Sequence, residues 1–327
     1  MVESREGRRR QGRVALLAAA VSLSLPALGA PLPALDAEKT FTVSGLSSGA
    51  YMAVQVHVAH SARVTGVGAV AGGPYYCAQG SLSAAYNNCM TPGGWFALPA
   101  TSTLKSRTEA FAKANQIDST KNIAAARIWL FSGTADKTVL PPVVQALKAY
   151  YESFNAKPVL VADKPAGHGM VTEEGGNACS TTAPPYVNDC DYDAAGELLR
   201  HLLQLNKPSK ENPKRLLEFD QDAYGLRSTG FVYVPASCEK ERCRVHVAFH
   251  GCRQTAKEFA QGAGYNRWAE PNRLIVLYPE VKASWWPYNP RGCWDWWGYS
   301  GREYATKEGA QVRAVLRMVE RLSAPRQ

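Results

Sequence analysis

Short apolar runs alternate with longer helix-like segments along most of the chain. Runs rich in β-branched and aromatic residues predict strands at 39–43, 64–73, 127–133, 158–163, 230–235, 244–250 and 274–279. Longer apolar segments predict helices at 50–60, 141–154, 193–205 and 308–322. Pro141 at a helix start and Asp193 as a helix N-cap support two of these assignments. The alternation of strands and helices indicates an α/β fold.

Two segments interrupt this pattern. The stretch from Cys77 to about Thr103 is rich in Gly, Pro and Asn and is predicted to be an excursion tied by a disulfide. The polar stretch Asn206–Arg215 has the composition of a domain linker. Because further strands follow it, we interpret the chain as one domain whose two halves complete a single sheet.

The N-terminus has the pattern of a signal peptide. Residues 1–13 contain five arginines, and the apolar run Val14–Ala30 follows them. The alternative, a membrane anchor, is disfavoured because Pro26 interrupts a run shorter than the roughly 20 apolar residues of a membrane span. We therefore predict a signal peptide over residues 1–30, with Ala37 as another possible end, and a catalytic domain over 38–327.

Charge excludes one class of partner. Residues 1–30 hold five arginines and two glutamates, so their removal lowers the net charge from +9 to +6. The remaining chain has no cluster of Lys or Arg interleaved with aromatic residues, so we expect no nucleic-acid partner. We expect no membrane partner either, and a monomer.

The eight cysteines favour a secreted, disulfide-bonded protein. Their even number behind a signal peptide indicates disulfides. Spacing suggests the local pairs Cys77–Cys89, Cys179–Cys190 and Cys238–Cys243, which leaves Cys252 for Cys293. No CxxC or HExxH spacing occurs, so we expect no metal site. The expected location is extracellular or periplasmic.

Candidate chemistry begins with a G-x-S-x-G motif. Gly45, Ser47 and Gly49 lie between a predicted strand and an apolar helix. In that context the glycines permit a sharp turn that lifts the central serine above the sheet at a helix N-terminus. Ser47 is therefore the predicted nucleophile, with Ser48 as the alternative.

A serine nucleophile needs a base and an orienting carboxylate. Asp136 follows the strand at 127–133, and His168 follows the strand at 158–163. The order Ser, Asp, His along the chain is that of α/β hydrolases. Asp163 is the second candidate for the acid. His57, His60, His201 and His246 lie within predicted helices and strands and are interpreted as packing or surface residues.

A strand that ends in His250-Gly251-Cys252 has the pattern of an oxyanion loop. The backbone N–H groups of Ser48 and Cys252 are the predicted donors. This strand normally precedes the nucleophile strand, but here it follows by about two hundred residues. The chain also ends in the helix that should come before the nucleophile strand. The sequence therefore indicates a circularly permuted α/β-hydrolase fold.

An aromatic segment, residues 284–299, surrounds Cys293. Such rings suit a polymer or ester substrate, although a partly buried aromatic cluster is the alternative. The candidate substrate-binding residues are Trp285, Trp286, Trp294 and Trp296.

Several stretches together resemble the circularly permuted polyhydroxybutyrate (PHB) depolymerases, which are single-domain extracellular esterases. The similar segments include Val43–Ala53, Ala71–Cys77, Gly133–Val139, His246–Cys252, Gly264–Ala269, Leu277–Pro279 and Gly292–Tyr299. The chain departs from the family pattern at Ala50, where Gly often stands, and at Lys137, which could alter substrate preference.

The resemblance implies the same triad of Ser47, Asp136 and His168, with tryptophan of the 292–299 segment in the substrate subsite. It further implies hydrolysis of poly(3-hydroxybutyrate) or its oligomers through an acyl-enzyme, without a cofactor. Two alternatives remain at this point: a secreted esterase acting on feruloyl or acetyl groups of plant polysaccharide, and a non-catalytic polymer-binding protein.

Overall fold

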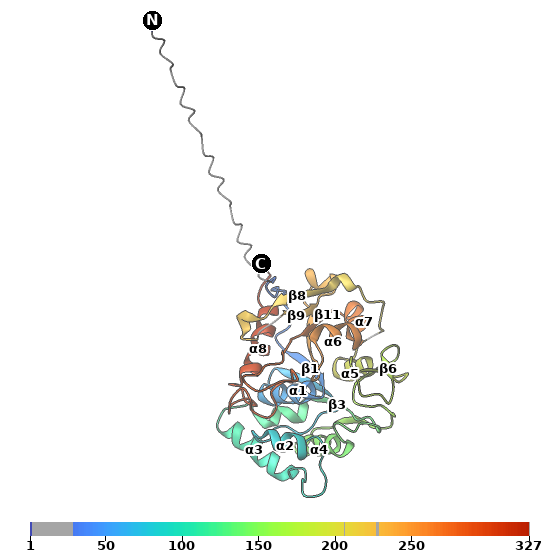
Figure 1. Cartoon of the computed structure of the whole chain (residues 1–327), viewed down its shortest axis with the longest axis vertical. Coiled ribbons are helices and arrows are strands. Elements are labelled where there is room, and N and C mark those ends of the chain that lie inside the picture. The colour runs from blue at the N-terminus through green and yellow to red at the C-terminus, as the bar shows by residue number, and fades with distance from the viewer. Residues whose placement is uncertain (2–28, 206, 227–228, 327) are drawn as a thin grey trace.

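Eight strands form one sheet in the computed structural model, which describes residues 1, 29–205, 207–226 and 229–326. The strand order across the sheet is β4-β3-β2-β1-β10-β11-β9-β8 (Figure 1). The strands span β1 Phe41–Leu46, β2 Val64–Val70, β3 Arg127–Phe131, β4 Val159–Val161, β8 Leu216–Asp220, β9 Thr229–Tyr233, β10 Arg244–Phe249 and β11 Leu274–Tyr278. From β4 to β11 neighbouring strands are parallel, whereas β9 and β8 are added antiparallel.

Helices cover both faces of the sheet. On one face Val54 of α1 (Ser48–Ala59), Leu147 of α4 (Pro141–Glu152) and Val315 of α8 (Ala310–Leu322) belong to one buried apolar cluster. On the other face a second cluster includes apolar residues of α5 (Ala194–Leu203), α6 (Ala256–Gly262) and α7 (Tyr265–Ala269). The result is the three-layer arrangement in which a mostly parallel sheet buries both faces.

The local signals for the four predicted helices are confirmed in α1, α4, α5 and α8. Pro141 starts α4, and the Asp193 carboxylate accepts a hydrogen bond from the Gly196 amide at the start of α5, at 2.9 Å. Helix α1 is buried along its whole length, which explains why its sequence is apolar all round.

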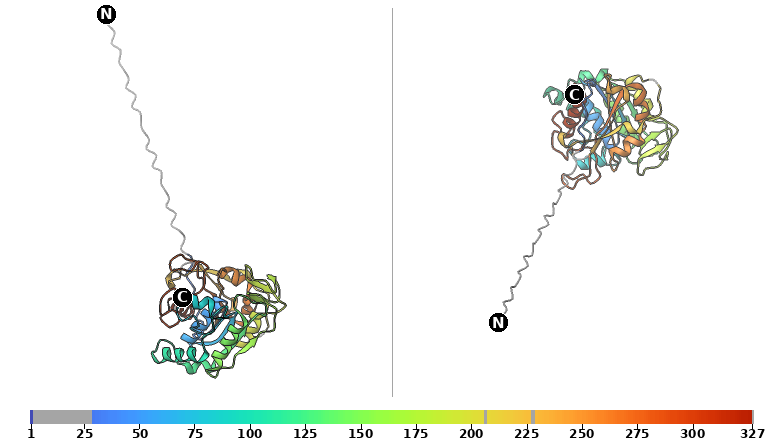
Figure 2. Two further views of the ribbon diagram at one scale, coloured as in Figure 1. Left: turned by 60° about the horizontal axis from the view of Figure 1, so that its bottom comes forward. Right: turned by 90° about the horizontal axis from the view of Figure 1, so that it is seen from above.

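Several elements were not predicted. Helix α3 (Thr101–Lys113) buries only Leu104 and Thr108, so it has almost no apolar stripe to reveal it. Helix α2 (Leu82–Asn87) is one and a half turns long and lies inside the predicted excursion. A small sheet of β5 (Met170–Thr172), β6 (Asn177–Ala178) and β7 (Val187–Asp189) lies at the edge of the body in two further views (Figure 2).

The two halves of the chain meet at the centre of the sheet, as expected for one domain. Strand β1 pairs directly with β10, in parallel, with Gly45 opposite Phe249. The polar stretch around residue 210 therefore connects two halves of one sheet. Ser209 in that stretch donates its backbone N–H to the Arg267 carbonyl at 2.9 Å.

The C-terminal helix lies beside the start of the first strand. The amides of Leu35 and Ala37 both donate to the Leu322 carbonyl at 3.0 Å, and Ser323 Oγ donates to the Glu38 carbonyl at 3.0 Å. This is the adjacency that a permuted chain requires, and Figure 1 shows the C-terminus beside the blue segment that leads into β1. The permutation itself remains an interpretation of this adjacency.

The predicted signal peptide falls almost entirely outside the described residues, but its boundary does not. Leu32 is fully buried, and Leu35 and Ala37 are buried in the same apolar cluster. Cleavage after Ala37 would remove all three of these core side chains. Ala30 is therefore the boundary that the packing favours.

All four predicted disulfides are present: Cys77–Cys89, Cys179–Cys190, Cys238–Cys243 and Cys252–Cys293. Among the described residues, no helix is long and apolar enough to cross a membrane.

Candidate active site

Ser47 occupies a strained turn between β1 and α1. Its backbone has φ 57° and ψ −122°, a left-handed value that non-glycine residues rarely adopt. A Cβ at Gly45 would lie 2.3 Å from the Gly49 carbonyl oxygen, and one at Gly49 would lie 2.3 Å from the Phe249 oxygen. The flanking glycines are thus required by close backbone approach, and the turn holds Ser47 at the carboxyl end of the central strand.

The neighbouring hydroxyl has a different role. Ser48 Oγ accepts a hydrogen bond from the Trp294 amide at 3.3 Å and is buried. Ser47 lines the pocket described below, whereas Ser48 does not. The geometry therefore favours Ser47 over Ser48 as the nucleophile.

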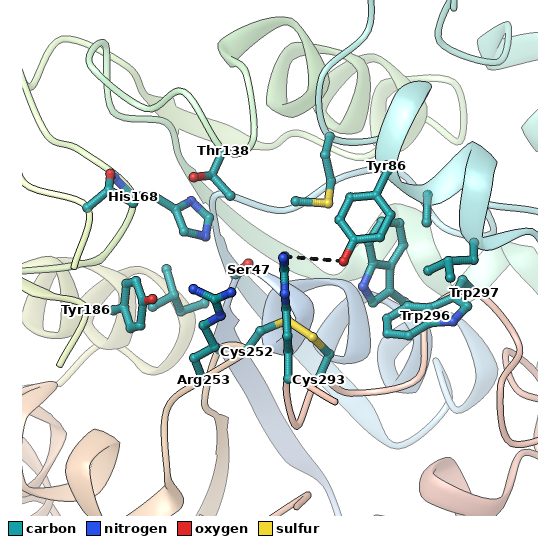
Figure 3. A pocket seen from close by; sticks show the side chains of 17 residues that line it. Ser47, Tyr86, Thr138, His168, Tyr186, Cys252, Arg253, Cys293, Trp296 and Trp297 are labelled. Carbon is teal, nitrogen blue, oxygen red and sulfur yellow. Dashed lines mark hydrogen bonds between the residues drawn. A yellow bond between two sulfur atoms is a disulfide. The ribbon is translucent and has the colours of Figure 1, made fainter. Parts of the chain in front are cut away.

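His168 and Asp136 are directly joined. His168 Nδ1 lies 2.8 Å from Asp136 Oδ2, and both side chains are almost completely buried. Because an ionised carboxylate only accepts hydrogen bonds, Nδ1 carries the proton and Nε2 is left as the basic nitrogen. Figure 3 shows the imidazole turned toward the Ser47 hydroxyl.

Backbone groups fix this pair in place. Asp136 Oδ1 accepts from the amides of Thr138 at 2.8 Å and Val139 at 3.0 Å. The His168 amide donates to Thr182 Oγ1 at 2.9 Å. The loop of His168 is also hydrogen-bonded to the Cys179–Cys190 disulfide region through Gly167 N–H and the Cys179 carbonyl, at 2.8 Å.

The second acid candidate is not brought to the histidine. Asp163 is exposed, pairs with Lys164 at 3.4 Å, and does not line the pocket.

The other histidines behave as packing residues. Burial lowers the pKa of His57 and His246 to about 3. It also lowers the pKa of His60 to about 4 and that of the part-buried His201 below its ordinary value. None of these four rings lines the pocket.

The predicted oxyanion donors belong to two elements that meet near Ser47: Ser48 follows it in the chain, and Cys252 lines the same pocket. Ser48 N–H is the first amide of α1, and Cys252 N–H follows β10; neither donates to another group of the described residues. His250 Nδ1 donates to the Gly251 carbonyl at 2.7 Å, and this carbonyl belongs to the same peptide unit as Cys252 N–H. The imidazole thus fixes the orientation of that peptide plane.

His250 is in turn held from behind. Its Nε2 accepts from the Val281 amide at 3.2 Å and lies 3.5 Å from Glu280 Oε1. Burial lowers the pKa of His250 to about 4 and raises the pKa of Glu280 to about 7. The result is a neutral imidazole at the start of the predicted oxyanion loop, residues 250–252.

A pocket of about 230 Å³ opens over these groups (Figure 3). Ser47, His168 and Cys252 line it, together with Trp296 and a further set of residues. That set comprises Leu46, Leu82, Ala85, Tyr86, Met90, Thr138, Thr182, Tyr186, Gly251, Arg253, Arg291, Cys293 and Trp297. Apolar and aromatic side chains make up most of the lining, and the polar ones include Ser47, His168, Arg253 and Arg291; such a mixture is typical of a small-molecule site.

The four candidate tryptophans divide into three groups. Trp296 lines the pocket and stacks on Tyr51, with ring centroids 3.9 Å apart. Trp294 is fully buried and meets Phe249 edge-on, so its proposed contact with substrate is corrected: the ring packs behind the site. Trp285 and Trp286 are 82% and 92% exposed and lie outside the pocket lining, so the structure does not bring them to the nucleophile.

Sequence reasoning missed several residues of the site. Tyr86 lines the pocket from the short helix α2, and Tyr186 and Arg253 line it from loops, and none of these segments has a strong apolar pattern. Asp295 is buried and accepts from the amides of Trp297, Gly298, Tyr299 and Ser300, at 2.7–3.2 Å. This carboxylate shapes the loop that follows Trp296. The only sequence signal for Asp295 is that an acidic residue stands among aromatic residues in the segment 284–299.

Among the described residues there is no cluster of three or more His, Cys, Asp or Glu side chains arranged to hold a metal ion.

A serine on a strained strand–helix turn, a histidine–aspartate pair and a neighbouring strand-end loop that is predicted to hold the oxyanion are the architecture of a serine hydrolase of the α/β-hydrolase type. The family model for esterase PHB depolymerases matches residues 229–325. The chain is 36% identical over 319 residues to the polyhydroxybutyrate depolymerase of Talaromyces funiculosus, covering 89% of this chain and 92% of that protein. The chain belongs to the PHB depolymerase family.

Further comparisons agree with this family. The poly(3-hydroxybutyrate) depolymerase of Delftia acidovorans is 43% identical over 312 residues, which cover 90% of this chain but 62% of that longer protein. The crystal structure of PHB depolymerase from Penicillium funiculosum superposes with a TM-score of 0.78 at 35% identity, covering 90% and 98% of the two chains. A serine-to-alanine variant of a PHB depolymerase complexed with an R3HB trimer gives a TM-score of 0.79 at the same identity and coverage.

Proposed function

We propose that this protein is a secreted serine esterase that hydrolyses the ester bonds of poly(3-hydroxybutyrate) or its oligomers. The main observation behind this proposal is the His168–Asp136 pair, whose imidazole lines the same aromatic pocket as Ser47. Family membership and the similarity to a depolymerase complexed with a hydroxybutyrate trimer supply the substrate class.

The mechanism follows from the hydrogen bonds already described. His168 Nε2 takes the Ser47 proton while the Asp136 carboxylate stabilises the imidazolium that forms. Ser47 Oγ attacks the ester carbonyl carbon, and the negative charge on oxygen is stabilised by the N–H groups of Ser48 and Cys252. His168 then protonates the leaving alkoxide oxygen. Water, activated by the same imidazole, releases the acyl group and regenerates Ser47.

Other aspects of the proposal concern the whole chain. The four disulfides suit an oxidising compartment, and we assign residues 1–30 as the signal peptide that directs export to the periplasm or outside the cell. The proposed substrate is a polyester or oligoester, and the protein acts as a monomer without a cofactor. N-terminal sequencing of the exported protein should begin at Pro31; a start at Glu38 would contradict the boundary.

One comparison of substrates tests the proposal. The purified protein should clear a poly(3-hydroxybutyrate) suspension and release 3-hydroxybutyrate oligomers, and Ser47→Ala should abolish both. Hydrolysis of methyl ferulate or acetylated xylan without clearing would identify the plant-polysaccharide esterase instead. If neither the unsubstituted protein nor Ser47→Ala clears the suspension but both bind the polymer, the chain is a polymer-binding protein.

A further inference from the structure

An arginine without a protein partner lies in the pocket. Arg253 lines the pocket and is exposed, and its guanidinium makes no hydrogen bond or ion pair with any other described residue. No Asp or Glu is among the described residues that line the pocket. The second arginine there, Arg291, is already engaged: its Nη1 donates to the Tyr86 hydroxyl at 3.4 Å, and it lies 5.9 Å from the Tyr86 ring centre.

The backbone of Arg253 is held firmly. Its N–H donates to the Arg291 carbonyl at 2.7 Å, and Cys252 just before it is bonded to Cys293. Gln254 just after it accepts from the Gly251 amide at 2.8 Å and donates to the Pro185 carbonyl at 2.7 Å. Arg253 itself has a φ of 59°, in the left-handed region that disfavours a bulky side chain. A strained, well-anchored position thus presents a free cation to the pocket.

The position of Arg253 within the pocket indicates which part of a bound substrate its guanidinium would contact. In Figure 3, Arg253 lies with His168 and Tyr186 on one side of Ser47, whereas Tyr86, Trp296 and Trp297 lie on the other. In the proposed reaction His168 protonates the leaving alkoxide, so the leaving fragment occupies the His168 side. In a chain of 3-hydroxyacid units, the fragment that leaves as the alcohol is the one that ends in the free carboxyl group.

We propose that Arg253 binds the terminal carboxylate of the leaving fragment, which makes short acid-terminated oligoesters preferred substrates of this esterase. This inference rests on the proposed function, and it adds which end of the substrate lies on the Arg253 side of Ser47. The terminal carboxylate is the one negatively charged group of such a polyester chain. A guanidinium pairs with a carboxylate through two parallel hydrogen bonds. The acyl fragment, which ends in a hydroxyl group, then lies along the aromatic side.

The test compares the dimer of 3-hydroxybutyrate as its free acid with the same dimer as its methyl ester. Cleavage of the internal ester is followed by chromatography of 3-hydroxybutyrate or methyl 3-hydroxybutyrate. Arg253→Gln should lower kcat/KM for the acid by roughly tenfold, as loss of a partly exposed charged hydrogen bond predicts, and leave the methyl ester within about twofold. Arg253→Lys should retain part of the preference, and added salt should reduce it in the unsubstituted enzyme.

Arg302→Gln is the matched control, since Arg302 is also exposed but lies outside the pocket lining. Arg302→Gln should leave kcat/KM unchanged for both the acid and the methyl ester. Equal losses on acid and ester in Arg253→Gln, or no loss on either, would overturn the inference while leaving the proposed function intact. If the unsubstituted enzyme cleaves neither dimer nor polymer, the proposed function fails as well.

Discussion

At the scale of single residues, the site depends on a few side chains whose neighbours decide their roles. Ser47 and Ser48 are adjacent, yet the hydroxyl of Ser48 is engaged by the Trp294 amide and that of Ser47 lines the pocket. Likewise Trp294 and Trp296 are two positions apart, and only Trp296 reaches the pocket. Sequence motifs locate such pairs, but burial selects between their members.

Asp136→Asn should separate orientation from folding. The asparagine oxygen can still accept from the Thr138 and Val139 amides, so the fold should be kept. The NH₂ group of the asparagine cannot accept a hydrogen bond from His168 Nδ1–H, so the tautomer with its proton on Nε2 is favoured. That tautomer cannot act as the base, and kcat should fall about 10⁴-fold, by analogy with other serine hydrolases. Ester hydrolysis and the thermal midpoint are measured together. A loss of less than tenfold in kcat would contradict the assigned role.

Trp296→Ala should affect oligomers more than small activated esters. Loss of an aromatic contact with substrate is expected to cost on the order of 1–3 kcal/mol in transition-state binding. The ring also stacks on Tyr51, so Trp296→Phe serves as the milder variant that preserves packing. Rates on the hydroxybutyrate trimer and on p-nitrophenyl acetate give the comparison. Equal losses on both substrates would mean that the ring supports the fold only.

At the scale of elements, the disulfide Cys252–Cys293 connects the oxyanion loop to the aromatic segment. Replacing both cysteines with serine removes a link across 41 positions, which is expected to lower the free energy of unfolding by about 4 kcal/mol. Because Cys252 supplies a proposed oxyanion donor, kcat should fall as well. Thermal unfolding and kcat on a soluble ester provide the two measurements.

The matched control is the pair Cys238 and Cys243, which lies before β10, at the opposite end of the strand from the oxyanion loop. Its removal should cost about 2 kcal/mol of stability, because the loop is short, and leave kcat unchanged. Similar losses of kcat in both double variants would show that general stability, rather than local geometry, governs the effect.

The burial of Glu280 beside His250 should make the free energy of unfolding depend on pH. Burial raises the pKa of Glu280 to about 7, so its favourable contribution exists while the carboxyl is neutral and is lost as pH rises through 7. The loss between pH 5 and 8 should be on the order of 2–3 kcal/mol. Glu280→Gln should remove this alkaline loss, as measured by urea unfolding at several pH values. A variant with the same pH dependence as the parent would refute the assignment.

At the scale of the whole molecule, buried neutral histidines should make the protein sensitive to acid. The pKa values of His57 and His246 are lowered to about 3 by burial, whereas in the unfolded chain these groups titrate near 6.5. Their contribution is therefore present above pH 6.5 and is lost as pH falls. We expect a loss of about 1–2 kcal/mol for each ring between pH 7 and 5, measured in the Glu280→Gln background. Unchanged stability over this range would contradict their burial as neutral groups.

The sequence predicted the sheet strands with strong apolar runs, the four helices α1, α4, α5 and α8, and the disulfides, because each follows from local pattern or spacing. It also predicted Ser48 and Cys252 as donors to one oxyanion, and the strands that lead to them, β1 and β10, are direct neighbours in the sheet. Helix α3 and the small sheet of β5, β6 and β7 were missed because they bury few side chains or are two or three residues long. Arg253 was missed because nothing in the sequence marks an arginine as unpaired.

The central claim is that Ser47 is the nucleophile of a polyester hydrolase, and active-site labelling tests it most directly. The protein is treated with a fluorophosphonate, digested, and the labelled peptide is identified by mass spectrometry, while clearing of a poly(3-hydroxybutyrate) suspension is followed in parallel. We predict one label, on Ser47, with clearing lost in proportion to labelling, and neither label nor clearing in Ser47→Ala. A label on Ser48, or clearing that survives complete labelling of Ser47, would contradict the account.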